Sequence, residues 1–165
     1  MATMLSLIPS VIKGMTVGDL EKIKKICRGV FPTARQVSTK RVAEWMGEPK
    51  SCPLLIDVRS PKEFAVSHLP GALNLRSADA ISRAIAERAT VSRTVLYCSV
   101  GFRSSRLASE LQREIKNVMN LEGSIFEWAN EGRSLFQGEQ PTKKVHPFGK
   151  IWAGLLKPGL ASPGD

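Results

Sequence analysis

Short apolar runs that alternate with helix-start signals are the feature that most constrains the fold of this chain. Runs at 54–58, 94–97 and 117–121 are rich in apolar side chains, and stretches with helical periodicity separate them. Runs of this length are typical of strands buried on both faces. Strands separated by helices pair in parallel through right-handed crossovers. The sequence therefore predicts an α/β fold, with a parallel sheet covered by helices on both faces.

The strongest helix-start signal lies just after the first apolar run. Ser60 stands at the N-cap, Pro61 at the first helical position and Glu63 at the capping-box position, so we expect Glu63 to act as a cap residue. Ser124 and Glu127 predict a second capping box. The remaining expected elements are strands at 35–37 and 72–75, and helices that begin after Ser38, Ser77 and residue 103.

Composition divides the 165 residues into three regions. Residues 1–33 are expected to form an N-terminal extension with one short helix, in which Leu20, Ile23 and Cys27 share a face. Residues 34–136 form the α/β domain. Residues 137–165 form a basic tail in which prolines limit regular structure, apart from a short apolar helix at 151–156 that could dock on the domain.

The net charge of +9 belongs mostly to the two ends of the chain. Residues 1–40 carry seven basic and two acidic side chains, and residues 141–165 carry four lysines and one aspartate. An acidic protein or RNA partner could bind these basic ends. The alternative is an ordinary solvated surface.

The cysteines and the hydropathy pattern indicate the compartment. Cys27, Cys52 and Cys98 are odd in number and form no C-x-x-C pair, so neither a disulfide framework nor a zinc site is expected. We expect no metal and no cofactor. No apolar run approaches the roughly 18 residues that a membrane helix needs, so no membrane partner is expected. A cytoplasmic location follows, and targeting to an organelle stays open.

The segment with the clearest chemical signal is Thr94-Val-Leu-Tyr-Cys98-Ser-Val-Gly101-Phe-Arg103-Ser104. A thiol follows a buried strand, and a short loop leads into a helix. Loop amides and the helix N-terminus supply partial positive charge, and Arg103 supplies a full one. Both lower the pKa of a neighbouring thiol. Gly101 permits the tight turn, and Cys98 is thus a candidate nucleophile.

At this point the sequence resembles the rhodanese family over residues 35–136. Five motifs carry the resemblance, and their order and spacing match. They are Leu55-Ile-Asp57-Val-Arg59, Ser60-Pro61-Lys62-Glu63-Phe64, His68-Leu69-Pro70-Gly71-Ala72, Tyr97-Cys98-Ser-Val-Gly101-Phe-Arg103-Ser104 and Leu121-Glu122-Gly123 through Trp128 to Gly132. Val145-His146-Pro147-Phe148 and Trp152 are similar to the tail of some bacterial single-domain members.

The resemblance implies a five-stranded parallel sheet and a sulfurtransferase that carries sulfane sulfur as a persulfide on Cys98. Thiosulfate or a persulfide would be the donor, and a thiol or cyanide would remove the sulfur. Substrate binding would fall to the loop, at Ser99, Val100, Gly101, Phe102 and Arg103.

The remaining candidates are expected to be structural or inert. Asp57 lies in an apolar strand, where an unpaired carboxylate is costly, so we expect it to bind loop amides or Arg59 and to support the loop. His68 is taken as structural. Cys27 and Cys52 lack a comparable loop and are expected to be inert.

Two other functions use similar residues. A Cys-based phosphatase or arsenate reductase also holds a thiolate in a loop, but such phosphatase loops place five residues before the arginine. Here four residues separate Cys98 from Arg103. A protein-to-protein sulfur relay or a regulatory binding module is the second alternative. A relay would use the same persulfide, whereas a purely regulatory module would not need Cys98.

Overall fold

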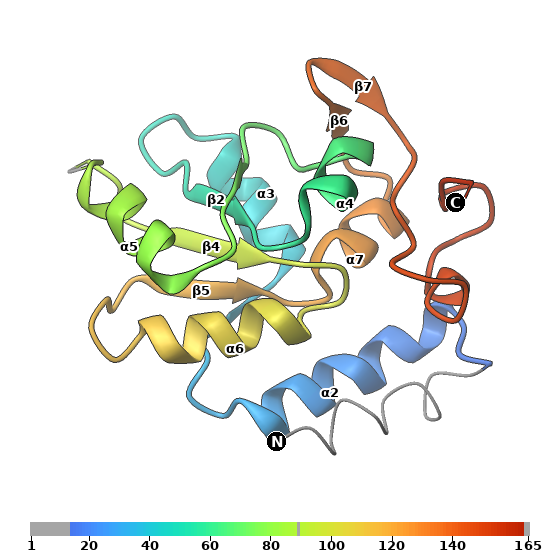
Figure 1. The fold of residues 1–165 in the computed structure, drawn as a ribbon, viewed down its shortest axis with the longest axis horizontal. Coiled ribbons are helices and arrows are strands. Elements are labelled where there is room, and N and C mark those ends of the chain that lie inside the picture. The colour runs from blue at the N-terminus through green and yellow to red at the C-terminus, as the bar shows by residue number, and fades with distance from the viewer. Residues whose placement is uncertain (1–13, 89, 164–165) are drawn as a thin grey trace.

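The computed structural model describes residues 14–88 and 90–163. Its centre is a five-stranded sheet in the order β1-β5-β4-β2-β3 (Figure 1). Every pairing in this sheet is parallel, which confirms the predicted fold class. The strands are β1 (Gln36–Val37), β2 (Leu54–Asp57), β3 (Leu73–Asn74), β4 (Thr94–Tyr97) and β5 (Val118–Leu121).

Helices cover both faces of the sheet, and a short hairpin lies between α7 and η2 in the chain. The α5 and α6 helices pack on one face, and α3 and α7 pack on the other (Figure 1). The helical segments are η1 (Val17–Asp19), α2 (Leu20–Val30), α3 (Thr39–Met46), α4 (Pro61–Val66), α5 (Ala78–Ala86), α6 (Phe102–Leu111), α7 (Ser124–Asn130) and η2 (Ala153–Leu155).

The central strand β4 contributes side chains to both halves of the core, because successive side chains of a strand point to opposite faces. Val95 and Tyr97 pack with α3 and α7. Leu96 and Cys98 pack with α5 and α6. This alternation fixes the side of the sheet on which the Cys98 side chain lies. In the part of the chain that the structure describes, no helix combines the length and apolar character needed to cross a bilayer.

Two expectations about helix starts are wrong. The α6 helix begins at Phe102 and not after residue 103, so Arg103 belongs to its first turn. At the second predicted capping box, Gly123 takes the cap position with a φ of 68°, and no side chain caps the helix. Ser124 is the first helical residue, and its hydroxyl instead accepts a hydrogen bond from the Cys98 amide.

The α2 helix packs into the core of the domain. Leu20, Ile23 and Cys27 share one face as predicted, and all three are buried in the larger core cluster. Lys24 is also buried and pairs with Glu127 at 2.9 Å. Removing residues 1–33 would therefore expose core surface. Residues 1–13, which bear on targeting, lie outside the described residues.

The tail has more structure than its prolines suggested. Strands β6 (Leu135–Gln137) and β7 (Gln140–Thr142) form an antiparallel hairpin around a two-residue turn that starts at Gly138, with a φ of 58°. The expected short apolar helix is present as the single turn η2, which buries Leu155 and contacts η1. The tail therefore docks against the N-terminal segment, as the red and blue ends of Figure 1 show.

The docking of the tail can be tested at Gly154. A Cβ atom built on Gly154 would lie 2.5 Å from the Met15 carbonyl oxygen. We expect Gly154→Ala to lower the free energy of unfolding by about 1–3 kcal/mol, the usual cost of overpacking. Denaturant titration measures this change. Gly149→Ala is the control, because its Cβ would meet no atom closer than 3.9 Å; equal losses in the two variants would contradict tight docking.

Candidate active site

Cys98 directly follows the central strand β4, at the carboxyl edge of the sheet. Its side chain is 1 % exposed and lies among apolar neighbours beside α6. Ligands of open α/β sheets bind at this edge. The predicted nucleophile therefore lies at the edge where folds of this class bind ligands, and its side chain is almost fully buried.

The Cys98 sulfur receives two hydrogen bonds from the loop and from the start of α6. The Gly101 amide donates to Sγ at 3.2 Å, and the Ser104 hydroxyl donates at 3.4 Å. Gly101 has a φ of 104°, and a Cβ there would lie 3.4 Å from Asn120 Nδ2. Glycine is required for this conformation, which turns the amide toward the sulfur.

The Cys98 thiol has a lowered pKa despite its burial. Burial by itself raises the pKa of a thiol, but the positive charge of Arg103, the hydroxyl and amide of Ser104 and the Gly101 amide outweigh it. The thiolate is the nucleophilic form of cysteine. The loop therefore favours the reactive state, as the sequence predicted.

Arg103 is held by Glu63, a contact that the sequence analysis missed. The guanidinium donates from Nη1 to Glu63 Oε2 at 3.0 Å and from Nη2 to Oε1 at 2.7 Å. Nη2 also donates to the Ser99 hydroxyl at 3.0 Å. This two-point geometry fixes the orientation of the guanidinium plane.

Glu63 also forms the capping box that the sequence predicted. Its Oε2 accepts from the amide and from the hydroxyl of Ser60, both at 2.9 Å. Burial alone would raise the pKa of Glu63, but the contacts with Arg103 and Ser60 have the larger effect and lower it to about 2. One carboxylate thus caps α4 and holds the arginine of the Cys98 loop.

The first turn of α7 fixes the Cys98 loop from the other side. The Cys98 amide donates to Ser124 Oγ at 3.1 Å. In return, the amides of Ile125 and Phe126 donate to the carbonyls of Cys98 and Ser99 at 3.2 and 3.1 Å. Helix N-termini leave such amides free, and here they are satisfied by the loop. Ser124 adopts a φ of 51° in this arrangement.

The tail adds an aromatic side chain to the site. The Arg103 Cζ lies 4.6 Å from the centre of the Phe148 ring, within the range of a cation–π contact. Phe148 is 47 % exposed and has a φ of 64°. Trp152 packs edge-on against it at 5.8 Å. The tail motif quoted above therefore lies against the loop that holds Cys98.

The loop positions expected to bind substrate have different surroundings. Ser99 is buried and bonds to Glu63 and Arg103. Val100 packs in the larger core cluster, and the Phe102 ring lies edge-on to Phe31 at 5.0 Å. The side chains of Val100 and Phe102 therefore anchor the loop. Donor binding by their backbone amides stays a prediction.

Asp57 and Arg59 form a fully buried ion pair, as expected for an aspartate in an apolar strand. Arg59 Nη2 donates to Asp57 Oδ2 at 2.6 Å and to the Ser67 carbonyl at 2.6 Å. Asn74 Nδ2 bonds to both of their carbonyl oxygens. These contacts fix the segment around α4 that carries Glu63. That the pair supports the Cys98 loop stays a prediction, and these hydrogen bonds lie within the segment from β2 to β3.

The other cysteines and His68 have surroundings that differ from those of Cys98, and their inert or structural roles stay predictions. Cys27 is buried, and burial raises the pKa of its thiol to about 12. Cys52 is exposed, and its thiol donates a hydrogen bond to the Pro53 carbonyl at 3.9 Å. The His68 ring stacks on Phe64 at 4.3 Å, and its backbone pairs with Phe136.

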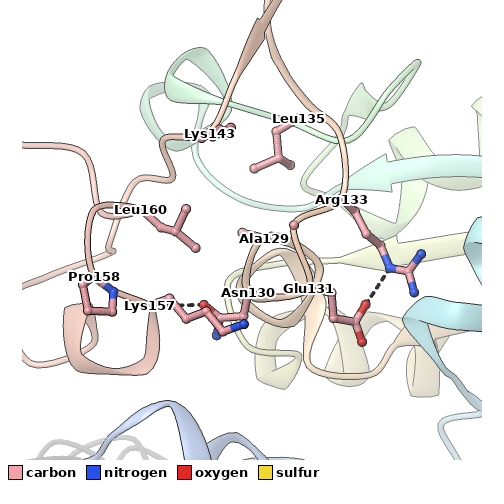
Figure 2. A pocket seen from close by; sticks show the side chains of 10 residues that line it. Ala129, Asn130, Glu131, Arg133, Leu135, Lys143, Lys157, Pro158 and Leu160 are labelled. Carbon is pink, nitrogen blue, oxygen red and sulfur yellow. Dashed lines mark hydrogen bonds and ion pairs between the residues drawn. The ribbon is translucent and has the colours of Figure 1, made fainter.

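A separate pocket lies between α7, the hairpin and the tail, with a volume of about 390 Å³ (Figure 2). Arg133 pairs with Glu131 inside it, and the Lys157 amide donates to Asn130 Oδ1 at 2.8 Å. None of the predicted site residues lines it. The pocket is therefore separate from the Cys98 loop, where the candidate reactive groups lie.

The comparison with known families agrees with the geometry. The family described as the rhodanese-like domain matches residues 38–131. The chain belongs to this family. The matched range runs from the N-cap of α3 to the end of α7 and contains the whole Cys98 loop.

Curated relatives in the rhodanese family include named sulfurtransferases. A "Sulfurtransferase" of Allochromatium vinosum is 36 % identical over 80 residues, which are 48 % of this chain and 74 % of the relative. The "Probable adenylyltransferase/sulfurtransferase MoeZ" of Mycobacterium tuberculosis is 29 % identical over 123 residues, which are 70 % of this chain. This chain spans 31 % of the length of MoeZ.

Solved rhodanese structures share the fold. The thiosulfate sulfurtransferase of Pseudomonas aeruginosa matches with a TM-score of 0.57 and 20 % identity, over 74 % of this chain and 24 % of that one. A rhodanese-related protein of Thermoplasma volcanium matches with a TM-score of 0.50 and 23 % identity, over 62 % of this chain and 98 % of that one. At these identities the likeness concerns the fold.

The lowered pKa of Cys98 can be tested by alkylation. We expect the iodoacetamide reaction of Cys98 to titrate below the ordinary thiol pKa of about 8.5, in a Cys52→Ser background that removes the exposed thiol. Arg103→Ala should raise this pKa, because Arg103 stabilises the thiolate. Arg106→Ala on the exposed face of α6 is the control. An unchanged pKa in Arg103→Ala would contradict the assigned role of the guanidinium.

The ion pair of Glu63 predicts a specific loss of stability in acid. The pKa of Glu63 is lowered to about 2, so its contribution is complete above the ordinary carboxyl pKa of about 4.3 and is lost as pH falls toward 2. Because the Glu63 side chain is almost fully buried, the loss in the free energy of unfolding amounts to about 2–3 kcal/mol.

Urea unfolding at both ends of this pH window measures the difference. Glu63→Gln should lose less stability across the window than the native protein, because glutamine does not titrate. Glu44→Gln, on the exposed face of α3, is the matched control. If the native and Glu63→Gln curves run parallel, Glu63 does not have a lowered pKa.

Proposed function

We propose that this protein is a sulfurtransferase that carries sulfane sulfur as a persulfide on Cys98. The observation that carries the proposal is a thiol at the carboxyl edge of the sheet with a lowered pKa and with two hydrogen bonds aimed at its sulfur. Membership of the rhodanese-like family and the names of its relatives support the same reaction class.

The first half-reaction is a displacement at sulfur. The Cys98 thiolate attacks the outer sulfur of the donor and forms a new S–S bond, while the bond between that sulfur and the rest of the donor breaks. With thiosulfate, the leaving group is sulfite, which takes the electron pair of the broken bond. The Sγ lone pair forms the new bond, the outer sulfur keeps its single negative charge in the persulfide, and sulfite leaves with two negative charges.

The second half-reaction returns Cys98 to the thiolate. A thiolate or cyanide acceptor attacks the outer sulfur, and the electron pair of the S–S bond returns to Cys98 Sγ. The Gly101 amide and the Ser104 hydroxyl contact this atom, so they stabilise the leaving thiolate. Fixed donors of this kind need no reorganisation during the reaction.

The length of the loop favours sulfur over phosphoryl chemistry. Four residues separate Cys98 from Arg103, and both η nitrogens of Arg103 bind Glu63. A phosphoryl group needs donors for three equatorial oxygens. The Gly101 amide and the Ser104 hydroxyl, both aimed at Sγ, suit a single sulfur atom.

Transfer to a protein acceptor is the second candidate. MoeZ is named for an adenylyltransferase and a sulfurtransferase together, and a sulfur acceptor on another protein would be compatible with the same Cys98 persulfide. The basic ends are weaker support for such a partner than their composition suggested. Lys22, Lys24 and Arg28 already form ion pairs with carboxylates of this chain. A cytoplasmic location is part of this proposal.

Mass spectrometry tests the proposed intermediate. After incubation with thiosulfate or an organic persulfide, intact protein should gain the mass of one sulfur atom, located on Cys98. Cys98→Ser should abolish sulfur transfer to cyanide or a thiol, because a serine hydroxyl is far less nucleophilic at neutral pH.

Cys52→Ser is the control and should keep its activity. Native protein should also fail to hydrolyse an aryl phosphate. Sulfur loading at Cys52, or robust phosphatase activity that depends on Cys98, would overturn the proposed function.

A further inference from the structure

The charge of Arg103 is compensated inside the protein. Glu63 accepts from both η nitrogens, and its side chain is 4 % exposed while that of Arg103 is 32 % exposed. The carboxylate remains ionised at neutral pH because Arg103 and Ser60 lower its pKa to about 2. Arg103 and Glu63 therefore form a neutral pair beside Cys98.

The remaining surface of Arg103 is also partly covered. One face of the guanidinium lies against the Phe148 ring at 4.6 Å, and Nη2 makes a further bond to Ser99. A donor anion would have to compete with these contacts to reach the guanidinium. Once Cys98 is ionised, the group of Cys98, Arg103 and Glu63 carries one net negative charge.

This net charge acts differently on donors of different charge. A second negative charge on the donor adds a second repulsion, and a unit charge several ångströms away at an intermediate dielectric changes a rate constant about tenfold or more. Thiosulfate is a dianion. An organic thiosulfonate has the same sulfonyl–sulfur bond, but an alkyl group replaces one oxyanion, so it carries a single negative charge.

We infer that Glu63 is a specificity-determining residue that biases the Cys98 site toward singly charged organic sulfane-sulfur donors and away from thiosulfate. The inference rests on the proposed function and names its donor class. The exposed Phe148 ring offers the organic group of such a donor an apolar surface beside Arg103.

The reaction with a thiosulfonate balances in the same way as with thiosulfate. The Cys98 thiolate attacks the terminal sulfur, a new S–S bond forms, and the bond to the sulfonyl sulfur breaks. The electron pair leaves with the organic sulfinate, which carries one negative charge, and the persulfide on Cys98 carries the other. No oxidant or reductant is needed.

The test compares two donors in three forms of the full chain. Thiosulfate and the methanethiosulfonate anion are the donors, cyanide is the acceptor, and the readout is the ratio of their kcat/KM values. Intrinsic leaving-group differences between the donors cancel when this ratio is compared between variants. Glu63→Gln removes the charge but keeps an oxygen for the Ser60 cap, whereas Glu63→Asp keeps the charge.

We expect Glu63→Gln to raise the thiosulfate-to-methanethiosulfonate ratio about tenfold. Glu63→Asp should stay within about threefold of the native ratio, because the carboxylate is retained. Glu44→Gln, which removes a distant surface charge, should match the native protein. If Glu63 had a purely structural role, Glu63→Gln and Glu63→Asp would change the ratio of kcat/KM values in the same way.

The outcomes separate the two proposals. If the native protein takes sulfur onto Cys98 but the ratio is unchanged in Glu63→Gln, or shifts equally in Glu63→Asp, the inference is wrong while the sulfurtransferase function stands. If neither donor loads Cys98 in the native protein, both are overturned.

Discussion

The burial of the Cys98 thiol is the physical constraint on which the site depends. An isolated charge at 1 % exposure would be strongly destabilised, so Cys98 can ionise only where fixed donors and a cation surround it. The Gly101 amide, the Ser104 hydroxyl and Arg103 meet this requirement. Arg103 is itself largely withdrawn from water, and it in turn requires Glu63. Arg103 thus has a carboxylate partner on one side and lowers the pKa of the buried Cys98 thiol on the other.

The parallel sheet brings these partners together. The β2 and β4 strands are direct neighbours, so the segments that follow them leave the sheet at the same edge. One leads into α4, which carries Glu63, and the other leads through Cys98 into α6, which carries Arg103. The 2.7 Å contact between these two side chains therefore joins the first turns of two helices. The buried Asp57–Arg59 pair fixes the end of β2, so the position of Glu63 follows from the strand that precedes it.

The sequence allowed the parallel sheet and the order of its strands along the chain to be predicted, and it located the Cys98 loop, because these features depend on local patterns. Apolar runs identify buried strands, and Cys98 with Gly101 and Arg103 lies within one short segment. Glu63 was predicted only as a cap residue, since a capping box fully explains its position and nothing local shows that residue 103 lies nearby. Ser124 was misassigned for a related reason. A serine three residues before a glutamate resembles a cap, but the glycine before it adopts the φ of 68° and takes the cap position.

The contribution of the tail follows from tertiary packing that composition does not reveal. Phe148 adopts a left-handed backbone conformation with a φ of 64°, which costs of order 1–3 kcal/mol for a non-glycine residue. Such a conformation persists only where surrounding contacts impose it, and here Arg103 and Trp152 contact the ring. The single turn after Trp152 packs on the N-terminal segment, whose helix α2 buries Cys27 in the core cluster that also holds Val100. Segments on both sides of the family match therefore contact the start of α6, through Phe148 on Arg103 and Phe31 on Phe102.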